Sequence, residues 1–162
     1  MNTQKINKEI SDNEIWNSNK IQELKDHILT ESKKQSPERR LRNELLSIQY
    51  KIEDYIENED VNTEIKILDF VKLYLNTLNL TKKKLASAFE MKDSNLHKYL
   101  KGERKLNPDI VFKLSSFSHT KPELWYYIQA KNEFLKLKSE KDNLKKYEKY
   151  DFEKIMAGWK TM

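Results

Sequence analysis

The clearest pattern of apolar and polar positions lies in residues 81–102, which read TKKKLASAFEMKDSNLHKYLKG. Apolar residues recur there at helical spacing, at Leu85, Ala86, Phe89, Met91, Leu96, Tyr99 and Leu100. This spacing puts each set on one face of a helix, so we predict two short helices with a tight connection at residues 90–91. Thr81 has the side chain of an N-cap for the first helix, and Gly102 is expected to close the second in a left-handed conformation.

Three further helical patterns surround this stretch. The first follows an N-cap at residues 62–63 and is apolar over most of its girth, which is typical of a helix in a hydrophobic core. The second and third begin at Pro108 and Pro122, since proline is favoured in the first turn of a helix. The last helix is expected to pack through Leu124, Trp125, Ile128, Phe134 and Leu137. Together these patterns predict a compact five-helix domain over residues 63–137.

Residues 1–60 are expected to form an N-terminal helical extension with two helices. Ser11 and Glu14 have the spacing of a capping box and predict a helix over about residues 12–34. Its apolar stripe is thin and consists of Ile15, Ile21, Leu24 and Ile28. The polar, acidic run at residues 57–63 is the best candidate for a linker to the following domain.

The second helix of the extension is predicted over about residues 37–57, because Ser36 and Pro37 form an N-cap followed by a favoured first residue. Apolar residues then recur at steps of four and three, at Leu41, Leu45, Ile48, Ile52 and Tyr55. This seam lasts only two heptads, so two interpretations stay open. The helix either packs on its own chain or binds another molecule. In the second case its partner-binding candidates are Leu41, Leu45, Ile48 and Ile52.

Residues 138–162 combine a charged connector with a short amphipathic pattern. Residues 138–149 are mostly charged, which predicts a solvated helix extension or a loose connector. An apolar stripe then returns at Phe152, Ile155, Met156 and Trp159. A stripe that ends in a large aromatic residue either packs back on the domain or binds a partner. Its partner-binding candidates are Phe152, Ile155 and Trp159.

The composition favours an all-α fold and limits the chemistry. The 162 residues include only two glycines and three prolines, fewer than a sheet protein with many turns needs. Cysteine is absent, which excludes disulfides and thiolate metal sites and fits a reducing cytoplasm. No apolar run approaches the roughly 20 residues of a membrane span, and the first ten residues have no signal-peptide core. We therefore expect a cytoplasmic protein that has no membrane partner.

The net charge of +5 is concentrated in the middle of the chain. Residues 1–60 have a net charge of −3, residues 61–122 of +6 and residues 123–162 of +2. The positive excess therefore accompanies the two-helix stretch at residues 81–102, and it indicates contact with phosphate groups. The alternative for any single lysine is a solvated surface.

No pattern of catalytic or metal-binding residues occurs in the sequence. His27, His97 and His119 are far apart, and none has a second histidine at metal-ligand spacing. There is no Ser/His/Asp set, glycine-rich phosphate loop or HExxH motif. We therefore expect no metal, no cofactor and no enzymatic activity.

Two blocks of the predicted domain resemble a known family. Residues 81–102 resemble the helix-turn-helix of Xre-type, phage-repressor-like DNA-binding domains, which implies a five-helix lambda-repressor-like fold. RKLNPD at residues 104–109 and ELWYYIQA at residues 123–130 resemble the HigA-type antitoxin subgroup. The family commonly has glycine in the helix-turn-helix connection and Ser or Thr before the second helix, where this chain has Glu90 and Lys92. The resemblance covers about half of the chain.

The resemblance implies that the second helix of the motif enters the major groove of double-stranded operator DNA. Its base-reading positions on this chain are Ser94, Asn95, His97 and Lys98. Asn95 suits adenine and Lys98 suits guanine, whereas Asp93 is expected to cap the helix. The residues placed to contact phosphate are Thr81, Lys82, Lys83, Lys92, Lys101 and Arg104.

Trp125, Tyr126 and Tyr127 are consecutive, so a helix cannot turn all three inward. We expect Trp125 in the core and one tyrosine exposed. Because Xre-type domains pair through this late helix to read two half-sites, Tyr126 and Tyr127 are the candidates for a homodimer interface.

Three functions stay open at this point. The first is an antitoxin that represses its own operon and neutralises a HigB/RelE-like, mRNA-cleaving toxin. The second is a free-standing Xre-type transcription regulator without a toxin partner. The third is a protein-interaction module whose helix-turn-helix no longer binds DNA, and Glu90 and Asp93 are the features that favour it.

Overall fold

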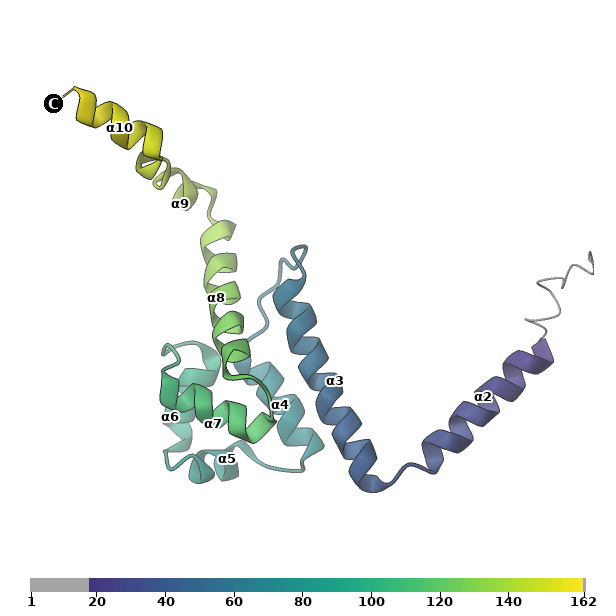
Figure 1. The fold of residues 1–162 in the computed structure, drawn as a ribbon. Coiled ribbons are helices and arrows are strands. Elements are labelled where there is room, and N and C mark those ends of the chain that lie inside the picture. Colours follow the sequence, from purple (N-terminus) through teal and green to yellow (C-terminus); the bar gives the residue numbers. More distant parts are fainter. Residues whose placement is uncertain (1–17, 162) are drawn as a thin grey trace, which may run out of the picture. The chain divides into compact units, whose positions relative to one another are not determined.

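The computed structural model describes residues 18–161. The predicted capping box at Ser11 and Glu14, together with Ile15, lies outside the described residues. All regular secondary structure between residues 18 and 161 is helical, which confirms the all-α prediction (Figure 1). The elements are α2 (Ser18–Lys33), α3 (Pro37–Glu57), α4 (Ile67–Thr77), α5 (Lys82–Ala88), α6 (Asp93–Lys101), α7 (Pro108–Ser118), α8 (Pro122–Ser139), α9 (Lys141–Lys145), the 3-10 helix η1 (Glu148–Tyr150) and α10 (Phe152–Lys160). None of the helices in this described range is long and apolar enough to cross a membrane.

The described part of the chain divides between Leu41 and Arg42 into two units, residues 18–41 and residues 42–161. In the first unit no residue from 19 to 41 is buried, and Leu24 and Ile28 are more than half exposed. The expectation that the apolar stripe of α2 faces inward is therefore not met within this unit. The physical reason is the small number of apolar residues on α2, which cannot build a core alone.

The boundary between the units falls inside α3, after Leu41, and not in the acidic run at residues 57–63 that the sequence indicates. Ile48, Ile52 and Tyr55 are buried in the core of the second unit. The Tyr55 ring lies 5.7 Å from that of Phe70, so this part of α3 packs on its own chain beside α4 (Figure 1). The assignment of Ile48 and Ile52 as partner-binding residues is corrected accordingly, because as core residues they are not accessible to a partner.

The core of the second unit is built around α4, which is buried on most sides as its sequence predicts. Its buried residues are Ile67, Leu68, Phe70, Val71, Tyr74 and Leu75. Trp125 of α8 is fully buried, as expected, and its ring lies 6.4 Å from that of Tyr74. Leu96 and Leu100 of α6 and Leu114 of α7 are also fully buried. The apolar face of α6 therefore packs against the hydrophobic core of this unit.

The hydroxyl group of Tyr74 is buried and has no hydrogen-bond partner within the described residues. Burial raises the pKa of Tyr74 to about 12, and the negative charge of Glu53 adds to the shift. The charged phenolate is therefore disfavoured in the folded unit.

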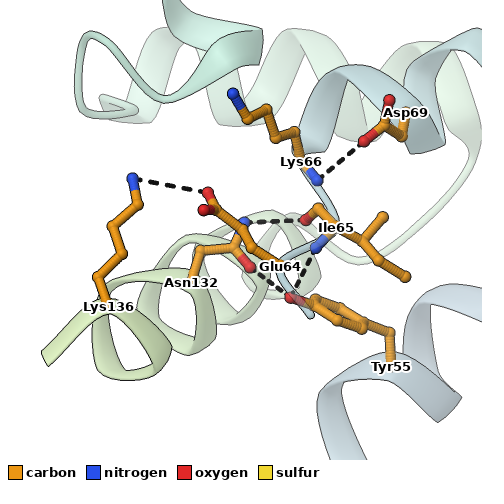
Figure 2. Close-up of polar contacts among 7 residues, drawn as sticks. All are labelled: Tyr55, Glu64, Ile65, Lys66, Asp69, Asn132 and Lys136. Atoms are coloured by element: carbon orange, nitrogen blue, oxygen red, sulfur yellow. Dashed lines mark hydrogen bonds and ion pairs between the residues drawn. The ribbon is translucent and has the colours of Figure 1, made fainter. Parts of the chain in front are cut away.

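Tyr55 links α3, the segment before α4, and α8 through hydrogen bonds (Figure 2). Its hydroxyl group donates to Asn132 Oδ1 at 2.5 Å and accepts from the Ile65 backbone N–H at 3.0 Å. The Asn132 amide donates in turn to the Ile65 carbonyl oxygen at 2.9 Å. Burial raises the pKa of Tyr55, the hydrogen bond from Ile65 opposes this shift, and the Glu64 carboxylate adds to it. The network joins residues that lie as much as 77 positions apart in the sequence.

Residues 57–63 are also held by a lysine of α8. Lys131 Nζ donates to the Asn58 carbonyl oxygen at 2.6 Å and lies 5.1 Å from the centre of the Tyr55 ring. These contacts fix the acidic run against α8, so it connects α3 to α4 inside one unit and does not act as a linker between domains.

Candidate functional site

The connection between α5 and α6 is a tight turn centred on Glu90, which adopts a left-handed conformation with φ 58°. The Glu90 N–H donates to the Ser87 carbonyl oxygen, and the Met91 N–H donates to the Ala86 carbonyl oxygen, both at 3.0 Å. This pair of bonds is the Schellman arrangement, in which the left-handed residue is usually glycine. The chain therefore keeps a regular turn without glycine, at a cost of about 1–2 kcal/mol in backbone strain.

A lysine of α7 caps the carboxyl end of α5. Lys113 Nζ donates to the Phe89 carbonyl oxygen at 2.9 Å and pairs with Asp109, one turn earlier on α7, also at 2.9 Å. A positive charge at this end of a helix is favourable, because it offsets the partial negative charge of the free carbonyl groups. The sequence shows only the spacing of Lys113 and Asp109, since Phe89 lies 24 positions away.

α6 begins at Asp93, with Lys92 as its N-cap residue. The Lys92 side chain makes no capping hydrogen bond and Asp93 is already helical, so the prediction that Asp93 caps the helix is wrong. The N-cap expected at residues 62–63 is also wrong, because α4 begins at Ile67 with Lys66 as its N-cap residue. The caps expected at the two outer ends of the α5–α6 pair are confirmed. Thr81 Oγ1 accepts from the Lys84 N–H at 3.2 Å, and Gly102 ends α6 with φ 81°.

The outward face of α6 lies opposite its two buried leucines. Ser94 and Lys98 are exposed on this face and stand one turn apart. Asn95 and His97 are partly buried and lie on its two flanks. The four residues expected to read bases therefore share one half of the helix, but only Ser94 and Lys98 are exposed.

His97 is in contact with a lysine from the start of α5. Lys82 Nζ lies 2.9 Å from His97 Nδ1 and 3.6 Å from Asp93 Oδ1. The Lys82 side chain is only 28% exposed, whereas the neighbouring Lys83 is exposed. Lys82 therefore links α5 to α6 and is less accessible to an external anion than Lys83.

The other basic candidates lie near both ends of α6. Lys92 is exposed at its amino end, and Lys83, which follows Lys82 in the first turn of α5, is also exposed. Lys101 is partly buried in its last turn, and Arg104 follows in the connection to α7, with its guanidinium carbon 5.2 Å from the centre of the Tyr99 ring. Positive charge therefore flanks the outward face of α6 at both ends.

The three consecutive aromatic residues of α8 are distributed as the sequence predicts. Trp125 is buried, Tyr126 is partly buried and Tyr127 is 53% exposed. Phe134, two turns after Tyr127, is 60% exposed, so the expectation that it packs inward is wrong. Tyr127 and Phe134 border one surface hollow of about 590 Å³. The apolar surface of α8 is therefore larger than the sequence indicates.

The C-terminal stripe forms α10, and none of the residues of this helix is buried. Phe152 and Trp159 are the most exposed, at 72% and 76%, and Ile155 is 43% exposed. Packing of this stripe back on the domain is therefore not observed. On α3, Leu41 is exposed and Leu45 is half-buried against the core, which leaves Leu41 as the accessible candidate of that seam.

Within residues 18–161, no group of three or more His, Cys, Asp or Glu side chains is placed to hold a metal ion. No family model, curated protein or solved structure matches the chain. Its function is therefore inferred from the α5–α6 pair, the basic residues around it and the exposed apolar helix faces.

Proposed function

We propose that this chain is a sequence-specific DNA-binding antitoxin that represses its own operon and neutralises a HigB/RelE-like, mRNA-cleaving toxin. In this proposal α4 to α8 form a lambda-repressor-like domain, and α5 and α6 are its helix-turn-helix. The observation that carries the proposal is the form of the α5–α6 pair. The apolar face of α6 is fully buried, its polar face is accessible, and a tight turn joins the helix to α5.

The accessible side of α6 suits recognition of base edges. The major groove of B-DNA admits an α-helix and presents a different pattern of donors and acceptors for each base pair. Lys98 would donate to guanine O6 and N7, Asn95 would pair with the adenine edge, and Ser94 would bond to either. Lys83 and Lys92 are the most accessible phosphate contacts, and each contact made steepens the dependence of log affinity on log salt by about 0.9.

The operator complex is expected to contain a homodimer, because two paired domains read half-sites one helical turn apart. Tyr127 is a better interface residue than Tyr126, since its side chain is more than half exposed. Phe134 extends the same apolar surface along α8.

The exposed stripe of α10 supports the antitoxin part of the proposal. An amphipathic helix binds a protein partner by laying its apolar face into a groove. Phe152, Ile155 and Trp159 provide such a face on α10. We assign the toxin as the partner of this face, in line with the resemblance to HigA-type antitoxins.

The two alternatives make different predictions. A free-standing regulator would use the same DNA-binding surface without a toxin. An interaction module without DNA binding is less well supported, because neither of the two residues that favour it disturbs the α5–α6 pair. Glu90 lies in a regular turn, and the charge of Asp93 is paired with that of Lys82.

DNA binding is tested by fluorescence anisotropy with the promoter of this gene at two salt concentrations. The unchanged chain should prefer the promoter over unrelated DNA, and Asn95→Ala with Lys98→Ala should remove that preference and leave the fold intact. The matched control is Lys72→Ala with Asn76→Ala, which deletes the same side-chain types from exposed positions on α4. Unchanged promoter preference in both double variants would overturn the assignment of α6 as the reading helix.

Toxin neutralisation is tested by co-expression with a small basic protein encoded beside this gene. The unchanged chain should rescue growth, and Phe152→Ser with Trp159→Ser should abolish the rescue without affecting promoter binding. Promoter binding without rescue by the unchanged chain would contradict the antitoxin role and favour the free-standing regulator.

A further inference from the structure

Lys82 contacts two side chains of α6 and is partly buried. Its Nζ atom is 2.9 Å from His97 Nδ1 and 3.6 Å from Asp93 Oδ1, and its side chain is 28% exposed. Lys83 and Lys84, the next two residues of α5, are exposed. The first turn of α5 therefore has one lysine in contact with α6 and two in solvent.

The contact with Lys82 determines which nitrogen of His97 carries the proton. A lysine ammonium group has three N–H donors and no acceptor, so the imidazole nitrogen that faces it at 2.9 Å must accept. His97 Nδ1 is therefore unprotonated. In a neutral imidazole the proton is then on the other nitrogen, so Nε2 is a donor on the part of the ring remote from Lys82.

We propose that Lys82 is a positioning residue that holds His97 as the Nε2–H tautomer, so that α6 presents a hydrogen-bond donor to the base edge at this position. The proposal rests on the proposed function, because it requires that α6 reads DNA. A donor is complementary to guanine O6 and N7, adenine N7 or thymine O4, and it is incompatible with the amino group of cytosine N4. His97 therefore selects an acceptor edge, and Asp93 holds Lys82 in place.

This role differs in a measurable way from a phosphate contact by Lys82. A phosphate contact strengthens binding to all sequences equally and contributes to the salt dependence. A residue that fixes the tautomer of a base-reading side chain changes the preference at one base pair and leaves the salt dependence unaltered.

The tautomer is measured on the free full-length protein by NMR of the histidine ring nitrogens, which distinguishes protonated from unprotonated nitrogen. We expect His97 to be protonated at Nε2 in the unchanged chain and to show a mixture of tautomers in Lys82→Met. A proton on Nδ1 in the unchanged chain, or an identical spectrum in the variant, overturns the proposal. Thermal unfolding of each variant checks that the fold is retained.

The base preference is measured by binding to operators in which each base pair is changed in turn. His97→Ala and Lys82→Met should each reduce discrimination at the same base pair by about two- to tenfold, which is the effect of one hydrogen bond. Because both act through that hydrogen bond, the double variant should reduce the discrimination no further than either single variant. The matched control Lys83→Met should weaken binding to all operators and lower the salt slope by about 0.9. If Lys82→Met behaves like Lys83→Met, the positioning role is overturned. If the unchanged chain binds no operator, the proposed function fails, and the role of His97 at a base edge fails with it.

Discussion

The substitution Tyr55→Phe isolates the contribution of one hydroxyl group to the packing of α3 on its own chain. The aromatic ring is kept, so the contact with Phe70 at 5.7 Å between ring centres is retained. Two hydrogen bonds are lost, because the hydroxyl group no longer donates to Asn132 Oδ1 or accepts from the Ile65 N–H (Figure 2).

We expect this change to lower the free energy of unfolding by about 2–4 kcal/mol. A hydrogen bond contributes about 0.5–1.5 kcal/mol, and a buried group left without a partner costs about 1–3 kcal/mol. Asn132 is only 8% exposed, so water does not readily replace the hydroxyl group there, whereas the partly exposed Ile65 can regain water. For a chain of this size the loss corresponds to a decrease in Tm of about 4–16 °C.

Tyr74→Phe is the matched control, because it removes the same atom from another buried tyrosine. The Tyr74 hydroxyl group has no hydrogen-bond partner within the described residues. Its removal should leave the stability unchanged or raise it by up to about 1 kcal/mol. Both variants are measured by urea titration with far-ultraviolet circular dichroism, and equal m-values show that each unfolds the same surface.

Equal losses in the two variants, or a larger loss in Tyr74→Phe, would refute the reasoning, because stability would then not follow the hydrogen bonds. A double-mutant cycle makes the comparison stricter. In an Asn132→Ala background, Tyr55→Phe should cost less than half of its effect in the unchanged chain, since one of its two partners is already absent.

Three further predictions address the turn, the pH dependence and the extent of the folded unit. Glu90→Gly should raise the free energy of unfolding in urea by about 1 kcal/mol, because glycine adopts the left-handed conformation without strain, and no gain would mean that Glu90 is unstrained. The free energy of unfolding should fall as pH rises from 10 to 12, because the pKa of Tyr74 is higher in the folded than in the unfolded chain. Tyr74→Phe should reduce this fall in urea titrations, and an unaltered fall would mean that Tyr74 does not cause it. Residues 42–162 should unfold cooperatively on heating, and residues 58–162 should not. The shorter chain lacks the three buried side chains of α3, whose burial contributes roughly 5–9 kcal/mol. Equal cooperativity of the two chains would contradict the unit boundary.

Helix ends that depend on local chemistry can be predicted from the sequence. The caps at Thr81 and Gly102 involve bonds that span only three residues, so the residue types alone identify them. Apolar periodicity likewise identifies α4 as a core helix and places Trp125 inside, because burial on most sides leaves few polar positions.

Contacts between residues distant in the sequence account for most of the differences between the predictions and the structure. An acidic polar run has the composition of a linker, and nothing in residues 57–63 shows that Lys131 holds it against α8. The contact between Lys82 and His97 spans 15 positions and is equally invisible in the spacing. The role of Asp93 was predicted wrongly for a local reason. A carboxylate is favourable both at the N-cap and in the first helical turn, so the residue type does not distinguish the two positions.

The central claim, that α6 reads DNA sequence, is tested most directly by selecting bound sequences from a random double-stranded library. With the unchanged chain we predict enrichment of paired half-sites whose centres lie about 10–10.5 base pairs apart, or a multiple of this spacing. With Asn95→Ala and Lys98→Ala the enriched bases should be lost, although salt-dependent binding persists. The absence of any enriched sequence with the unchanged chain, or the same enriched sequence with the variant, would contradict the claim.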